Sequence, residues 1–223
     1  MDIHKPKAAH SVREFLIEIG TIICGILIAL GLEQAVDALH RSAEVREARE
    51  AIRAEILANT SVLQWGVEED KCLLAQLPAY AAWARGGPKP QAFRTLLPEF
   101  RTNVWDTVKT TEAAHLPLEE RVGIAAFYDG LYNDQKVIDI QRSSSLVLFG
   151  AYERSTLSQA DAGRVLDAVA IETKLTDFHS ANSAALLKGA ATFGLRPPPL
   201  TSNEQDSMTR LCAGAPTGLP SHR

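Results

Sequence analysis

The sequence predicts an all-α protein in which an N-terminal transmembrane helix continues into a long helix that packs in a helical bundle domain. Three observations favour this fold class. Residues 15–32 form one apolar run, the segment 33–77 contains no proline and is rich in Ala, Glu, Arg and Leu, and no strand-like alternation of any length appears. The 223 residues are enough for one domain with a core and too few for two ordinary domains with a linker.

Composition excludes several classes of protein. Three cysteines are too few for a disulfide scaffold, and 11 prolines with 14 glycines are too few for a collagenous or disordered chain. A net charge of −4 argues against electrostatic binding to nucleic acid, so we expect no nucleic-acid partner.

The first element is a stub at residues 1–14, followed by a membrane span at 15–32 that reads FLIEIGTIICGILIALGL. Eighteen helical residues cover about 27 Å, close to the roughly 30 Å hydrocarbon core of the lipid bilayer. A buried core helix and a cleaved signal peptide are the alternatives. Acidic Glu14 and Glu18, together with helical sequence that continues past Gly31, favour an uncleaved anchor.

The orientation of the span depends on the charges beside it. Three basic residues lie within about 20 residues of either end, so the usual rule gives a tie. Residues 33–71 contain nine carboxylates against five bases, which leaves the stub as the flank not dominated by acid. We therefore expect a single-pass membrane protein with its short N-terminus inside and its helical domain, residues 33–213, outside.

The long helix beyond the span carries apolar residues at an average step of about 3.6, which indicates a straight helix packed on a globular partner. Asn59 is the one polar residue on this stripe. We expect Gly66 to kink the helix and Pro78 to limit it. The stripe consists of Val45, Ala48, Ile52, Ile56 and Leu63.

Residues 85–90, RGGPKP, break the chain and predict a hairpin back toward the first helix. Asn103 with Asp106 then predicts a short helix, on which we expect Trp105 to be a core anchor. Pro117 begins a long helix whose first turn is acidic. Its expected apolar face comprises Ile124, Phe127, Tyr128, Leu131 and Ile138.

Ser158 with Asp161 opens a further helix, which is expected to end near Gly194 before three prolines. Ser202 with Gln205 is expected to cap a last short helix, and residues 214–223 are predicted to be a disordered tail. The predicted apolar stripe of the helix after Ser158 consists of Val165, Ala168, Ile171, Leu175, Phe178 and Ala185.

Residues that could carry chemistry are scattered. No two of the six histidines have the i, i+3 or i, i+4 spacing of a helical metal site, so His115 and His179 read as ordinary surface or core histidines. The run Ser143–Ser145 has no base identified beside it. Nucleophile-elbow, phosphate-loop, dinucleotide and C-x-x-C motifs are all lacking in the sequence. We therefore predict no catalytic residue, no metal and no cofactor.

Cysteine and small residues supply the remaining candidates. Cys72 and Cys212 either form a disulfide in an oxidising compartment or are free thiols in a reducing one. Thr21, Gly25 and Ala29 form a small-residue stripe on one face of the span. Such a stripe allows two helices to approach closely and predicts transmembrane packing in a homo-oligomer, with lipid-facing filler as the alternative.

Two segments resemble a group of uncharacterised bacterial single-pass membrane proteins. Residues 10–37 contain the elements REFLIE and GILIAL, and residues 103–132 contain a Trp followed by an acidic residue and a helix that ends in a Tyr-containing turn. The resemblance covers about a quarter of the chain. It implies a single-pass bacterial membrane protein with a helical domain and brings no known catalytic residues. With the orientation above, we expect the chain in the bacterial inner membrane and its helical domain in the periplasm.

Three functions are compatible with this sequence. The favoured hypothesis is a membrane-anchored interaction or scaffold protein that binds an unknown protein partner. The alternative is an extracytoplasmic ligand-binding sensor that acts through a partner protein, because the stub is too short for an output domain. A hydrolase assembled from scattered residues is the third. A filled bundle core favours the first, and a deep polar cavity favours the other two.

Overall fold

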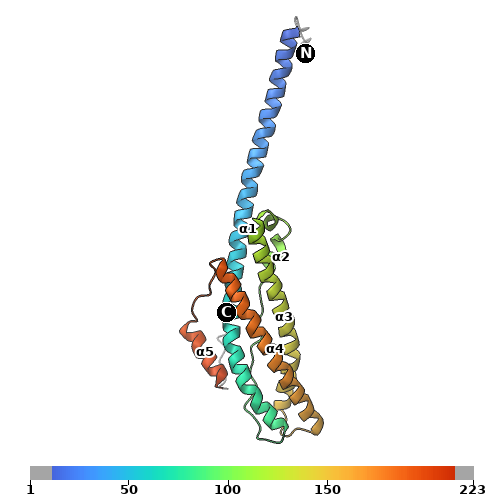
Figure 1. The fold of residues 1–223 in the computed structure, drawn as a ribbon, viewed down its shortest axis with the longest axis vertical. Helices are drawn as coiled ribbons and strands as arrows, with labels where there is room; N and C mark the ends of the chain where they lie inside the picture. Colours follow the sequence, from blue (N-terminus) through green and yellow to red (C-terminus); the bar gives the residue numbers. More distant parts are fainter. Residues whose placement is uncertain (1–11, 214–223) are drawn as a thin grey trace, which may run out of the picture. The chain divides into compact units, whose positions relative to one another are not determined.

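The computed structural model describes residues 12–213 and is all-α, with no strand among these residues (Figure 1). The predicted tail 214–223 and most of the predicted stub 1–14 lie outside the described residues. The elements are α1 (Val12–Ala84), α2 (Asn103–Val108), the 3-10 helix η1 (Glu112–His115), α3 (Leu118–Tyr152), α4 (Gln159–Thr192) and α5 (Ser202–Cys212).

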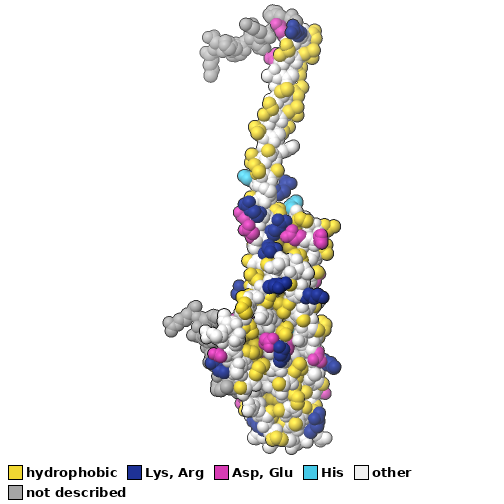
Figure 2. Space-filling model, turned by 60° about the vertical axis from the view of Figure 1, so that its left-hand side comes forward, with side chains coloured by type: hydrophobic (Ala, Val, Ile, Leu, Met, Phe, Trp, Pro, Cys, Tyr) yellow, Lys and Arg dark blue, Asp and Glu magenta, His cyan; other side chains and the backbone are white. Residues whose placement is uncertain are grey.

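Helix α1 belongs to two compact units that divide between Glu47 and Ala48. The first unit contains an apolar window of 18 residues with a mean hydropathy of 2.4, and none of this window is buried. Hydrophobic side chains cover the narrow helix that carries it, and the face shown in Figure 2 has no charged side chain over the middle of that helix. By length and composition this helix is able to cross a membrane.

The second unit is a helical bundle built from the C-terminal part of α1 with α3 and α4. Helices α3 and α4 lie side by side (Figure 1). The main apolar core joins them to α1 and to the strap, which we define as residues 87–102, a connection without helix or strand. Tyr80 of α1 packs edge-on against Phe93 of the strap with ring centroids 5.5 Å apart. Other members of this core are Leu73, Leu77, Trp83, Leu148, Ala151, Val165 and Ala168.

The stripe predicted on α1 is confirmed from Ala48 to Leu63, and Asn59 is buried within it. The prediction that Pro78 limits the helix is wrong, because α1 continues to Ala84. Pro78 lies on the exposed face, where a backbone carbonyl that loses its helical hydrogen bond can turn to water. Buried Leu77 and Tyr80 hold the helix on either side of it. The helix ends instead at Ala84, two residues before Gly86, whose φ of 94° is a conformation that glycine adopts readily.

The chain turns back along the first helix after residues 85–90, as the predicted hairpin requires, and it does so as the strap, which leads directly into α2. Trp105 of α2 is buried as expected, with 7% of its surface exposed. All five apolar residues predicted for the face of α3 are buried.

Helix α4 begins with the predicted capping box, in which Ser158 and Asp161 exchange side-chain and backbone hydrogen bonds. It ends two residues before Gly194, whose φ is 72°. The predicted apolar stripe is wrong beyond Ala168, because Ile171 and Phe178 are 44% and 49% exposed. At 100° per residue, Phe178 lies about 140° around the helix from buried Val165, whereas His179 lies within about 40° of it.

Helix α5 is capped one residue earlier than predicted, by Thr201 with Glu204 in place of Ser202 with Gln205. Of its eleven residues only Met208 and Leu211 are buried. They meet Cys72 of α1 in a small cluster edged by Trp65 and Leu96, separate from the main core. An isolated helix shorter than about 12 residues is marginal in water, so this cluster alone is a weak attachment.

Candidate functional site

Side chains of α1 hydrogen-bond the backbone of the strap along its length. The amide of Gln76 donates to the Arg94 carbonyl and accepts from the Arg94 N–H, both at 2.9 Å. Asn59 does the same with Arg101, at 2.7 and 2.9 Å. Each amide therefore satisfies a donor and an acceptor, as a neighbouring strand would. This explains how a long irregular segment is held at one position.

Glu69 bonds the middle of the strap from the same helix. Its carboxylate accepts hydrogen bonds from the backbone N–H of Leu96 and from the Thr95 hydroxyl, the latter at 3.0 Å. Only 4% of this residue is exposed. Burial raises the pKa of Glu69 to about 7, although both hydrogen bonds oppose that change. Glu69 therefore keeps its proton to a higher pH than an exposed glutamate does.

Glu55 anchors the first turn of α2 to α1. Its two carboxylate oxygens accept from the N–H groups of Val104 and Trp105, at 2.9 and 3.1 Å, and the Tyr128 hydroxyl donates to it at 2.6 Å. The Trp105 and Tyr128 rings stack with their centroids 5.1 Å apart. Burial, reinforced by the Glu55 carboxylate, raises the pKa of Tyr128 far above its ordinary value. Tyr128 is therefore neutral, and its bond to Glu55 helps to fix the carboxylate that anchors α2 on α1.

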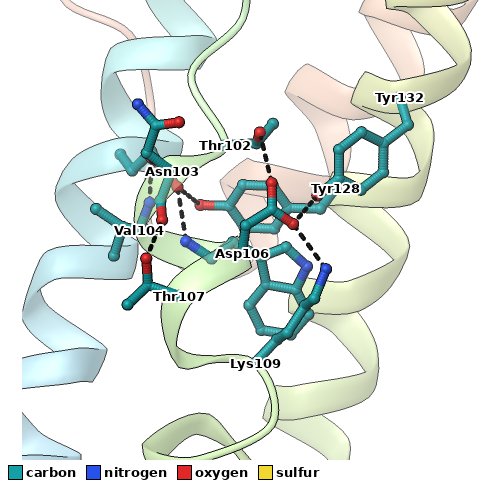
Figure 3. A network of polar contacts seen from close by, with 10 residues as sticks. Thr102, Asn103, Val104, Asp106, Thr107, Lys109, Tyr128 and Tyr132 are labelled. Atoms are coloured by element: carbon teal, nitrogen blue, oxygen red, sulfur yellow. Dashed lines mark hydrogen bonds and ion pairs between the residues drawn. The ribbon is translucent and has the colours of Figure 1, made fainter.

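Asp106 forms the solvent side of the same network (Figure 3). Lys109 and Tyr132 donate to one oxygen of its carboxylate, both at 2.7 Å, and Thr102 donates to the other at 2.9 Å. The hydrogen bond from Lys109 is the main reason that the pKa of Asp106 falls to about 2. The bond to Tyr132 joins α2 to α3. Because three donors already occupy the Asp106 carboxylate, it is not placed to act as a general base.

The buried face of α4 is polar over its middle turns, from Glu172 to Ser183. We call the polar residues buried where α4 meets α3 and α1 the polar seam. Hydrophobic packing alone does not explain the polar seam, because buried polar groups require hydrogen-bond partners. The polar seam consists of Asp70 from α1, Asp134, Gln141, Ser144 and Ser145 from α3, and Glu172, Thr176, His179 and Ser183 from α4.

His179 is the centre of the seam. Its Nδ1 lies 2.9 Å from Oδ2 of Asp70, and the histidine is 3% exposed. Burial alone would lower the pKa of His179, but the bond to Asp70 and the charges of Asp70, Asp134 and Glu69 raise it above its ordinary value. Burial also raises the pKa of Asp70, an effect that its bond to His179 reduces. The pair therefore retains protons to a higher pH than the free side chains would.

Gly66 makes room for this histidine. A Cβ at position 66 would lie 2.9 Å from Cε1 of the His179 ring, closer than real side chains approach. The glycine expected to kink α1 therefore has a packing role, and α1 continues through it as helix. His179 is confirmed as a satisfied core histidine on the Nδ1 side, and His115 is exposed in the last turn of η1.

The serine run has partners that the sequence did not identify. Ser144 and Ser145 donate to the same oxygen of Glu172, at 2.8 and 2.6 Å. Burial raises the pKa of Glu172, and the two serine bonds oppose this change. Ser183 donates to Asp134 at 3.3 Å, and burial likewise raises the pKa of Asp134. These hydroxyls act as donors to buried carboxyls and are not activated as nucleophiles.

Three buried atoms of the seam have no hydrogen-bond partner among the described residues. They are Nε2 of His179, Oδ1 of Asp134 and Oε2 of Glu172. Protonation of a carboxyl lowers the cost of burying it, in agreement with the direction of the pKa changes. Within residues 12–213 no group of three or more His, Cys, Asp or Glu side chains is arranged to hold a metal ion. The seam thus contains four buried titratable groups whose pKa values are all raised, Asp70, Asp134, Glu172 and His179.

The predicted membrane stripe belongs to the first unit. Thr21 donates its hydroxyl to the Ile17 carbonyl at 2.8 Å, which satisfies the group within its own helix. No heavy atom lies within 4 Å of a Cβ built on Gly25. With Ala29 at the next i+4 position, these residues form an open strip of small side chains.

Cys72 and Cys212 are joined in a disulfide, with their Cα atoms 4.8 Å apart across 140 positions of sequence. Cys72 is 4% exposed, whereas Cys212 at the end of α5 is exposed. Of the two alternatives that the sequence left open, the structure has the bonded form.

Comparisons with known protein families, with curated proteins and with solved structures found no match to this chain.

Sequence reasoning missed the polar seam, although a signal was present. Buried positions of α4 recur at steps of three and four residues. Between Ala168 and Leu186, the residues that lie on the same face as Val165 and Ala168 are polar, and the apolar residues lie on other faces. The complete buried set is Val165, Ala168, Glu172, Thr176, His179, Ser183, Leu186 and Ala190. Following the phase of the helix instead of the apolar residues would have identified it.

Proposed function

We propose that this chain is a single-pass protein of the bacterial inner membrane whose helical domain is a periplasmic interaction or scaffold module. The observation that carries the proposal is the fully exposed apolar window of α1, with its mean hydropathy of 2.4. Exposing so many large apolar side chains to water is unfavourable, and a lipid bilayer removes that cost. The resemblance of residues 10–37 to bacterial single-pass proteins agrees with this proposal.

The disulfide supports a periplasmic domain. Disulfides persist in oxidising compartments such as the periplasm and are rare in the cytosol. The Cys72–Cys212 bond therefore favours the orientation in which the basic stub is inside and the domain outside.

Self-association through the span is the most specific interaction that we propose. Without a hydrophobic force between helices in lipid, contact depends on close backbone approach. The open backbone at Gly25, between Thr21 and Ala29, provides such a surface for a second copy of the helix.

A ligand-binding sensor receives less support. The principal hollows of the described residues open to solvent, and residues of the polar seam do not line them. The seam instead fills the space where α3 and α4 pack with Asp70 of α1. A filled interior favours an interaction surface over a binding cavity.

Membrane attachment and orientation are tested together. After an alkaline carbonate wash the full chain should remain in the membrane pellet, and alkaline phosphatase fused to its C-terminus should be active. Release of the chain into the supernatant would contradict anchoring. An inactive phosphatase beside an active cytoplasmic reporter at the same site would place the domain inside the cell.

Self-association is tested with two substitutions in a membrane reporter assay of the span. Gly25→Ile should weaken association, because a branched side chain prevents close approach. Ile26→Leu, about 100° away around the helix, should have little effect and is the matched control. If both variants associate as the parent does, or if the parent does not associate, the stripe is lipid-facing filler.

A further inference from the structure

We propose that the Cys72–Cys212 disulfide is a redox-sensitive latch, which holds α5 against α1 and the strap and releases it when a dithiol reduces the bond. The inference goes beyond the proposed function and does not depend on which partner the domain binds. It rests on three observations: the few other attachments of α5, the exposure of Cys212, and the separate core of the remaining bundle.

Helix α5 has few attachments to the bundle apart from the disulfide. Met208 and Leu211 are its only buried residues. Apart from a contact of 4.0 Å between the sulfur atoms of Cys72 and Met208, the side-chain hydrogen bonds that we find for α5 within the described part of the chain remain local. Thr201 pairs with Glu204, Gln205 donates to the Leu200 carbonyl, and later bonds stay within the helix. The disulfide is therefore the main restraint at the end of this helix.

Reduction of the bond is sterically possible from one side. Cys212 is exposed and Cys72 is buried, so an incoming thiolate reaches the Cys212 sulfur first. Its attack forms a mixed disulfide with Cys212 and breaks the bond to Cys72, which leaves as a thiolate and takes a proton from water. The second thiol of the same dithiol then attacks the mixed disulfide. This step releases Cys212 as a thiol and leaves the reductant as a disulfide, so two electrons and two protons have passed to the protein.

We expect the reduced protein to release α5 and to keep the rest of its fold. An eleven-residue helix is too short to be stable alone, and two buried side chains do not offset the ordering of the segment. The main core contains no residue of α5, so α1, α3, α4 and the strap remain packed. Residues 193–201, with three prolines, keep the released helix tethered to α4.

Release uncovers an apolar surface. Trp65 of α1 and Leu96 of the strap now edge the cluster of Cys72, Met208 and Leu211. They also line a hollow that is already open beside α5. The apolar residues around this hollow are Val62, Trp65, Leu96, Leu97 and Pro98. Reduction would therefore enlarge an existing hollow into a continuous apolar face of α1 and the strap.

Hydrogen exchange of the full chain in detergent, read by mass spectrometry, tests the latch with dithiothreitol as the dithiol. Cys24→Ser is present in every sample, so that Cys72 and Cys212 are the only thiols. After reduction, amides of residues 204–212 should exchange at least tenfold faster, while residues 165–190 of α4 change by less than twofold. Cys212→Ser should show the same fast exchange of α5 without reductant.

Three results would overturn the latch. If both cysteines become available to alkylation while α5 keeps its slow exchange, packing holds the helix and the disulfide is redundant. If exchange rises equally throughout α3 and α4, the bond stabilises the whole domain. If dithiothreitol leaves the bond intact in the folded protein, Cys212 is not open to attack.

Discussion

Neutralising Glu69 gives the sharpest test of the buried electrostatics. The free Glu carboxyl has a pKa of 4.5, and in the folded domain burial raises it to about 7. Each unit corresponds to about 1.4 kcal/mol, so this single group lowers the free energy of unfolding by about 3 kcal/mol as the pH rises from 4.5 through 7. Its stabilising contribution is complete below pH 4.5, where both states are protonated, and is lost above pH 7.

Other buried groups change stability in the same direction. The pKa values of His179, Asp70, Asp134 and Glu172 are also raised, so the folded state holds more protons than the unfolded state at neutral pH. Asp106 and Asp161 have pKa values lowered to about 2, and they lose their contributions only in stronger acid. We therefore expect the domain to be more stable at pH 5 than at pH 8.

The assay is urea unfolding of the full chain in detergent, followed by tryptophan fluorescence between pH 5 and pH 8. Glu69→Gln keeps a side-chain oxygen for the Leu96 N–H and carries no charge. The parent loses about 3 kcal/mol of its free energy of unfolding through Glu69 as the pH rises, and the variant should not show this loss. Its free energy of unfolding should therefore match that of the parent at pH 5 and exceed it at pH 8. Glu68→Gln is the matched control, because that carboxylate is 41% exposed and pairs with Lys71.

Two results would refute this reasoning. One is a parent protein whose stability is constant or increases between pH 5 and pH 8. The other is a Glu69→Gln variant with the same pH dependence as the parent and as Glu68→Gln.

Two further pairs of substitutions test the packing. Trp105→Ala should lower the free energy of unfolding by about 3 to 5 kcal/mol, because the ring is buried and stacked on Tyr128, whereas exposed Phe178→Ala should change it by less than about 0.5 kcal/mol in the same urea titration. Equal losses would contradict the assigned face of α4. Gly66→Ala should destabilise by about 1 to 3 kcal/mol despite the better helix propensity of Ala, while Gly163→Ala, with open space around it, should stabilise by up to about 1 kcal/mol. A stabilised Gly66→Ala variant would show that the His179 ring moves freely.

Local signals in the sequence predicted the helices well. The stripe from Ala48 to Leu63, the apolar face of α3 and the capping box at Ser158 each depend on residues within one or two turns. The predictions for Pro78 and for the apolar stripe of α4 were wrong for a different reason. There the outcome depends on which face of the helix meets the bundle, and a single sequence does not specify that face.

The candidate site was less predictable than the fold. Glu172 and the serines of α3 are 27 and 28 positions apart, and Asp70 and His179 are 109 apart. No local pattern reports such pairings, since each residue alone is an ordinary polar residue on a helix. The strap was equally hidden, because Gln76 and Asn59 replace a hydrogen-bonding partner that normally comes from a neighbouring strand.

Leu96 connects two features of the domain, the buried carboxyl of Glu69 and the attachment of α5. Its N–H donates to the Glu69 carboxylate, and its side chain packs on the cluster of Cys72, Met208 and Leu211. We expect attached α5 to keep water from this part of the strap and so to favour the protonated carboxyl. Release of α5 would admit water and lower the pKa of Glu69. Because such coupling is reciprocal, protonation of Glu69 must in turn favour the attached helix.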